Sequence, residues 1–157
     1  MKTTLICIGK TNEPYWQSAI DEYTKRLKKY SPFEFIEIPD LKNAKSLTEA
    51  QIKQAEGENI LRLLTPEDHV VLLDDKGSQY TSLQFADWYQ RRTLSGSKRL
   101  VFIIGGPYGF SPAVYDRASE KLSLSKMTFS HQIIRPLFLE QLYRANTILH
   151  HEPYHHE

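Results

Sequence analysis

Two uninterrupted apolar runs constrain the fold of this chain more than any other feature of its sequence. Residues 70–73 read Val-Val-Leu-Leu, and residues 100–104 read Leu-Val-Phe-Ile-Ile. A strand with one face in water alternates apolar and polar residues, whereas a strand covered on both faces of a parallel sheet is apolar throughout. Both runs therefore predict strands in the interior of a parallel sheet, buried between two layers of helices.

Helical patterns separate these two runs from each other and from three further strand candidates. Strands are predicted over residues 3–9, 33–38, 70–73, 100–104 and 122–125. Helices are predicted over 14–30, from a Thr48–Gln51 capping box through Leu64, from a Thr81–Gln84 capping box through Tyr89, from Ser111-Pro112, and over 131–149. This alternation predicts a three-layer α/β fold with a mostly parallel sheet. Residues 1–157 are expected to form a single domain.

Composition and charge exclude several classes of protein. The 20 Lys and Arg residues nearly balance the 19 Asp and Glu residues, which excludes a uniformly basic nucleic-acid binder and an acidic disordered chain. The charge is uneven, however, because residues 31–75 carry four basic and ten acidic side chains, and residues 76–157 carry ten basic and six acidic ones. The single cysteine, Cys7, is expected to be buried and allows no intramolecular disulfide. With no secretory or membrane-spanning apolar run, we expect a cytoplasmic protein without a membrane partner.

The predicted ligand site lies where the parallel strands end. In open α/β sheets, ligands bind beyond the carboxyl ends of the strands. These ends lead here into residues 73–77, 105–109 and 125–131. The glycines of 105–109 allow close approach of a ligand to the backbone, with a plain tight turn as the alternative. Residues 123–131 mix hydroxyl and apolar side chains, which suits an adenine ring, with an ordinary strand-to-helix connection as the alternative. The glycines match neither a dinucleotide fingerprint nor a Walker loop.

Each of the other candidate residues could have a purely structural role instead of a functional one. Asp74 and Asp75 are adjacent at a strand end and are expected to point in opposite directions. Arg144 is expected either to meet an anion or to pair with Glu140, one helical turn earlier. His131 either serves the site or caps the last helix. The histidine-rich end of the chain predicts no metal site, because a frayed terminus does not hold ligands rigidly.

Short motifs along the whole chain occur together in one order: Gly9-Lys10, Tyr15-Trp16, Glu22-Tyr23, 36–39, Glu56-Gly57, Leu73-Asp74, 104–109, 124–131, 140–145 and 153–155. Taken together, these motifs resemble the RlmH (YbeA) family of SPOUT methyltransferases over essentially the whole chain. Ser130 departs from the proline that relatives carry before the histidine, and we expect this to alter loop rigidity more than chemistry.

This resemblance implies a parallel α/β sheet with a deep C-terminal trefoil knot. It implies a homodimer that binds S-adenosylmethionine in the knot, without a metal. The implied activity is methylation of N3 of pseudouridine 1915 in 23S rRNA within assembled 70S ribosomes. The implied cofactor-binding residues are Leu73, Gly105, Gly106, Gly109, Leu124, Ser125, Lys126, Met127, Thr128 and Phe129. The implied catalytic residues are His131, Arg144, Tyr154 and His155, with the tail expected to reach the partner subunit's pocket.

The implied chemistry suits these residue types. N3 of pseudouridine must lose a proton, for which His131 and His155 are both candidate acceptors, and Arg144 is a candidate to stabilise the resulting anion. Two rival hypotheses stand beside the enzyme. A non-catalytic ribosome- or RNA-binding α/β factor would share the basic second half but need no cofactor pocket. An unrelated nucleotide-binding α/β enzyme is disfavoured because its phosphate-binding loops are missing.

Overall fold

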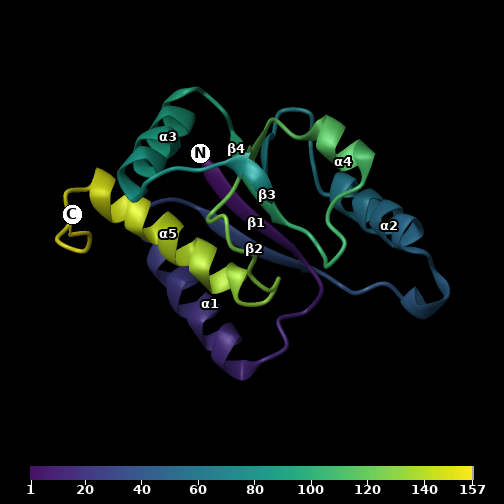
Figure 1. The fold of residues 1–157 in the computed structure, drawn as a ribbon. Coiled ribbons are helices and arrows are strands. Elements are labelled where there is room, and N and C mark those ends of the chain that lie inside the picture. The colour runs from purple at the N-terminus through teal and green to yellow at the C-terminus, as the bar shows by residue number, and fades with distance from the viewer. Residues whose placement is uncertain (157) are drawn as a thin grey trace.

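The centre of the fold is a five-stranded sheet in which all neighbouring strands are parallel, in the order β2-β1-β4-β3-β5 (Figure 1). The computed structural model describes residues 1–156. The strands are β1 Lys2–Ile8, β2 Phe33–Ile38, β3 His69–Ser78, β4 Arg99–Ile104 and β5 Glu120–Leu122. The two apolar runs lie in β3 and β4, which are neighbours in the sheet interior. The prediction of a parallel sheet is confirmed.

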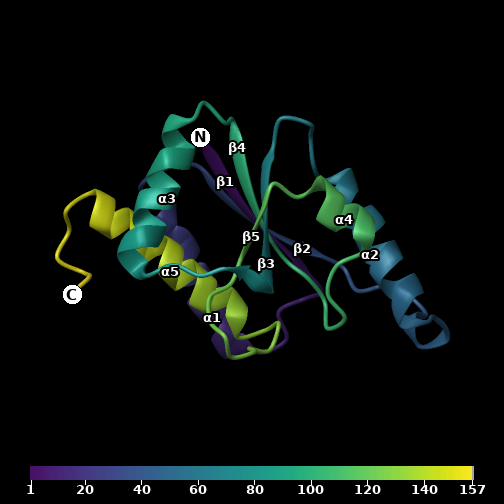
Figure 2. The same cartoon turned by 45° about the horizontal axis from the view of Figure 1, so that its top comes forward.

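Helices cover both faces of the sheet and complete three layers (Figure 2). One face carries α1 Pro14–Leu27, α3 Ser82–Leu94 and α5 Ile134–Leu149, with α5 packed between the other two. The opposite face carries α2 Glu49–Arg62 and α4 Pro112–Arg117, and a short 3-10 helix, Ala44–Ser46, precedes α2. Within residues 1–156, none of the helices has the length and apolar character to cross a membrane.

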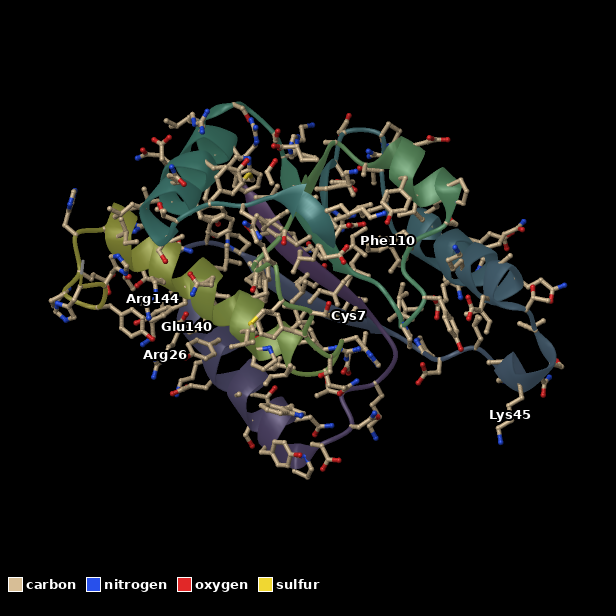
Figure 3. The ribbon with its side chains drawn as sticks, viewed as in Figure 1. Cys7, Arg26, Lys45, Phe110, Glu140 and Arg144 are labelled. Carbon is tan, nitrogen blue, oxygen red and sulfur yellow. The ribbon has the colours of Figure 1, made fainter. Side chains whose placement is uncertain are left out.

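Two apolar cores lie on the two faces of the sheet, which explains why the central strands are apolar throughout. Leu5 and Phe102 pack with Phe138 of α5 in one core, while Ile6 and Ile103 belong to the other. Successive strand residues point to opposite faces, so both sets must be apolar. Cys7 is buried in the first core (Figure 3), and burial raises the pKa of its thiol to about 12, which makes it a packing residue.

Local capping chemistry determines several helix starts as predicted. Both capping boxes are formed, with Thr48 and Thr81 each bonded reciprocally to the residue three positions later. Ser111 caps α4, and Pro112 occupies its first position. The helix predicted over 131–149 begins later, at Ile134, after a turn in which the Ser130 hydroxyl accepts from the Ile133 N–H at 3.1 Å.

The outer part of the sheet differs from the prediction. The strand predicted over 122–125 instead spans Glu120–Leu122, because the Ser123 hydroxyl donates to the Ser125 carbonyl oxygen at 2.8 Å and closes a turn. Strand β3 is longer than predicted and is interrupted, since Leu73 and Ser78 both pair with Leu122 of β5. The intervening residues bulge out of the sheet at its carboxyl edge, where the ligand site was predicted.

Candidate active site

A cavity of about 620 Å³ lies beyond the carboxyl ends of β3, β4 and β5. This volume falls in the range of small-molecule and cofactor sites. Three loops from separate parts of the chain form it, and α5 closes one side. The lining residues are Leu73–Lys76, Ile104–Phe110, Tyr115, Leu122–Ser125, Met127–His131 and Ile134.

The glycine-rich loop turns back on itself at the cavity wall. The Gly109 N–H donates to the Gly106 carbonyl oxygen at 3.1 Å, and Gly109 adopts a φ of +84°, which favours glycine. A Cβ at Gly106 would lie 2.9 Å from both carboxylate oxygens of Glu56. Glycine is therefore required at 106 by close packing behind the loop and at 109 by the turn, and the backbone of both residues faces the cavity.

The segment before α5 forms the opposite wall. The Ser125 hydroxyl accepts from the Met127 N–H at 2.9 Å, so hydroxyl groups shape this loop from within. Met127 and Phe129 line the cavity while remaining exposed, Met127 at 77% and Phe129 at 39%. Apolar side chains opposite the glycine backbone suit a flat heteroaromatic ring, which needs both an apolar face and hydrogen bonds at its edge.

The bulge in β3 brings two carboxylates to the cavity. Strand alternation in the sequence predicted them on opposite faces of the sheet. Asp74 and Asp75 both line it, so the expectation that they point in opposite directions is wrong. Burial disfavours ionisation of Asp74, but hydrogen bonds from the Tyr115 hydroxyl and the Lys76 N–H outweigh it and hold the pKa of Asp74 below its usual range. Burial and this bond to Asp74 raise the pKa of Tyr115 to about 12.

His131 lines the cavity at the turn that leads into α5. Its carbonyl oxygen accepts from Arg135 Nε at 3.0 Å, and the Arg135 guanidinium is fully buried. Burial and the positive charge of Arg135 lower the pKa of His131, although Asp40 opposes them. These shifts favour the neutral imidazole, which is the form that can accept a proton.

The other three candidate catalytic residues gather at the far end of α5. Arg144 donates to Glu140 Oε1 at 2.6 Å, as the predicted pair, and its Nη1 lies 3.1 Å from His155 Nδ1. The Tyr154 hydroxyl donates to the same Glu140 oxygen at 3.0 Å. We name Glu140, Arg144, Tyr154 and His155 the tail cluster. Figure 3 shows Arg144 and Glu140 well away from Phe110, which lies in the cavity wall.

Comparison with known proteins decides the family. Residues 1–155 match the family described as "Predicted SPOUT methyltransferase". The chain belongs to the SPOUT methyltransferase family. It is 60% identical over 157 residues to a Parabacteroides distasonis protein named "Ribosomal RNA large subunit methyltransferase H". Proteins of the same name from Bacteroides fragilis and Phocaeicola vulgatus are 56% and 55% identical. Each of these matches covers 100% of both chains.

Membership of the SPOUT family implies S-adenosylmethionine as the methyl donor, and the cavity fits such a group. It has the volume, a wall of glycine backbone where a side chain would collide with Glu56, and apolar side chains for an adenine ring. Across residues 1–156, no group of three or more His, Cys, Asp or Glu side chains is arranged to hold a metal ion.

The structure separates the predicted site residues of this SPOUT chain into two places. Every predicted cofactor residue except Lys126 lines the cavity, together with His131. Arg144 lies ten residues beyond Ile134 on α5, about 15 Å along the helix axis. The sequence placed Asp75 in the predicted 73–77 loop but gave it no role, and it missed Phe110 and Tyr115 as lining residues. Phe110 directly follows the predicted glycine loop, and this position was the one available signal for it.

Proposed function

We propose that this chain methylates N3 of a pseudouridine in 23S rRNA of the large ribosomal subunit, in the cytoplasm, within assembled 70S ribosomes. The observation that carries the proposal is the cavity at the carboxyl edge of the sheet, with its wall of glycine backbone and with His131 in the opposite wall. The large-subunit substrate is supported by relatives up to 60% identical that carry it in their names.

The backbone and apolar side chains of the cavity suit S-adenosylmethionine. Leu73, Gly105 and residues 124–129 would hold it, largely through backbone groups and the exposed faces of Met127 and Phe129. When bound, S-adenosylmethionine supplies a methyl group on a sulfonium. Such a displacement needs positioning more than covalent help from the protein, and two loops fixed by internal hydrogen bonds supply that positioning.

His131 accepts the N3 proton in this proposal. N3 is a weakly acidic imide nitrogen, and a neutral imidazole at the cavity wall is suited to receive its proton. Arg144 stabilises the anion that forms, since its charge is permanent and its pKa is raised further by its hydrogen bond to Glu140. Tyr154 and His155 hold that guanidinium and stack against the target base.

The distance between the cavity and the tail cluster supports a homodimer. Within one chain, His131 and Arg144 lie near opposite ends of α5 and cannot contact one base together. A partner related by two-fold symmetry places its tail cluster at the cavity of the first chain, and the first chain places its tail cluster at the cavity of the partner. Each active site then combines one chain's cavity with the partner's tail.

We also propose that the C-terminal part of the chain forms the deep trefoil knot expected of this family. Its support is the route of the chain after β5. From the sheet edge, residues 123–133 pass along the cavity opposite the 105–109 loop, and α5 then packs between α1 and α3.

Incubation with labelled S-adenosylmethionine tests this function. Purified protein is supplied with 70S ribosomes, free large subunits or naked 23S rRNA from cells that lack the modification. We expect label in the rRNA of 70S ribosomes and little in naked rRNA. Label in naked rRNA alone would contradict the assembled substrate. Ribosome binding with no label in any sample would instead favour the non-catalytic binding factor.

A further inference from the structure

Glu56 of α2 is a buried carboxyl group without a counter-charge. It is 8% exposed, and its Oε1 has no hydrogen-bond partner. Within residues 1–156, no lysine, arginine or histidine forms an ion pair with it. Buried carboxylates are normally paired or hydrogen-bonded, so an unpaired one inside a fold calls for an explanation, and a positive charge bound during function is one.

The carboxyl group lies directly behind the wall of the cavity. Both of its oxygens would be 2.9 Å from a Cβ on Gly106, and the Gly106 backbone lines the cavity on its other side. Only that backbone separates Glu56 from the ligand space. Because protein backbone fills this space, the field of the carboxylate reaches into the cavity with less screening than a surface charge would have.

The groups around Glu56 leave this field uncancelled. Burial and the negative charge of Asp40 both raise the pKa of Glu56, because no neighbouring positive charge among the described residues stabilises its ionised form. The fully buried cation of the fold, Arg135, is engaged by the Ile8 and Gly9 carbonyl oxygens and by Glu37. A cationic ligand in the cavity would relieve the repulsion between Glu56 and Asp40, whereas a neutral ligand would not.

We propose that Glu56 is a specificity-determining residue that favours the cationic methyl donor over its uncharged product in this cavity. The inference rests on the proposed function. In the transfer, the carbon–sulfur bond to the methyl group breaks, and the sulfur keeps the electron pair. The sulfonium thereby becomes the neutral thioether of S-adenosylhomocysteine, while N3 gains the methyl group and gives its proton to His131. Loss of the ligand's charge weakens its attraction to Glu56 and promotes product release.

Calorimetric titration of both ligands tests this inference without any turnover. S-adenosylmethionine and S-adenosylhomocysteine are each titrated into the wild type and the Glu56→Gln and Glu56→Met variants. The matched control is Glu58→Gln, which removes an exposed carboxylate from the same helix. We expect both Glu56 variants to shift the ratio of the two dissociation constants by about tenfold toward the product. This is the size expected for unit charges roughly 10 Å apart at an effective dielectric near 20.

The outcomes are distinguishable. The Glu58→Gln variant should keep the wild-type ratio, and Glu56→Asp, which keeps the charge, should lie closer to the wild type than Glu56→Gln does. If the Glu56 variants weaken both ligands equally, or bind both as the wild type does, Glu56 has no role in charge discrimination and the inference is overturned. If the wild type binds neither ligand, the proposed function itself fails.

Discussion

The guanidinium of Arg135 donates to the carbonyl oxygen of Ile8 at 2.7 Å and so ties the first turn of α5 to the end of β1. The same group donates to the Gly9 carbonyl oxygen at 2.9 Å and to the Thr11 hydroxyl at 2.9 Å. Its Nε donates a hydrogen bond to the carbonyl oxygen of His131. One buried cation therefore fixes the loop that carries His131 to the carboxyl edge of the sheet.

Replacing Arg135 should destabilise the fold strongly. Arg135→Met fills the space but leaves several buried carbonyl groups without donors, so we expect a loss of about 3–5 kcal/mol in the free energy of unfolding. Urea denaturation measures it. Arg91→Met, whose side chain is 62% exposed, is the control and should change stability by less than about 0.5 kcal/mol. A loss below about 1 kcal/mol for Arg135→Met would contradict this account.

The turn at Gly109 should matter for cofactor binding. An alanine there meets nothing within 4 Å but must adopt a φ near +84°, which costs about 1–2 kcal/mol in backbone energy. We expect Gly109→Ala to weaken S-adenosylmethionine binding because the loop relaxes away from the cavity. Gly96→Ala carries the same backbone strain, at φ +83°, in the α3–β4 connection and should leave binding unchanged. Equal dissociation constants for both variants would refute the role of the turn.

The ion pair of Asp68 and Arg99 should make stability depend on pH. Arg99 donates to the two carboxylate oxygens at 3.0 and 2.7 Å. Burial alone would raise the pKa of Asp68, but the pairing with Arg99 and the hydrogen bond from the Thr65 N–H lower it below the usual value. A carboxyl group with a lowered pKa stabilises the fold above its unfolded pKa, about 3.9, and this contribution disappears as the pH falls through the folded value.

The Asp68→Asn variant isolates this contribution. At pH 7 we expect a loss of about 2 kcal/mol, because the variant removes a nearly buried charge from its partner. As the pH falls below about 3.9 and through the lower pKa of folded Asp68, the wild type and the variant should converge in urea denaturation. Asp87→Asn, at an exposed pair on α3, serves as the control with almost no effect. A difference that stays constant from pH 7 to pH 3 would show that the charge is not responsible.

His131 should determine the rate of transfer rather than cofactor affinity. We expect His131→Ala to lower single-turnover methylation by about 10²–10⁴-fold while the dissociation constant of S-adenosylmethionine changes little. Because burial and Arg135 lower its pKa, the acid limb of the wild-type rate profile should lie below the usual value of about 6.5. Exposed His151→Ala is the control. A full rate in His131→Ala, or an unshifted acid limb, would exclude His131 as the base.

Much of the scaffold follows from local sequence signals. The runs at 70–73 and 100–104 predict buried parallel strands, and the boxes at Thr48 and Thr81 predict helix starts, because each signal depends on neighbours along the chain. The position of the cavity follows from strand direction alone, since ligands gather at the carboxyl edge of such sheets.

The missed features depend on contacts between distant segments. The bulge that brings Asp74 and Asp75 together arises because Leu73 and Ser78 both pair with Leu122, which no local pattern encodes. The burial of Arg135 depends on carbonyl groups more than 120 residues away in the chain, and arginine is rarely buried. The exclusion of Arg144 from the cavity depends on the length of α5 and on where the cavity lies along it.

The measurement that tests the account most directly is the activity of mixed dimers. One chain carries His131→Ala, which damages the cavity side, and the other carries Arg144→Ala, which damages the tail cluster. If each site combines one chain's cavity with its partner's tail, the mixed dimer retains one intact site, and we expect about half of the wild-type turnover from two parents that are inactive alone. Mixed dimers as inactive as their parents would contradict the shared site and place all catalytic groups within a single chain.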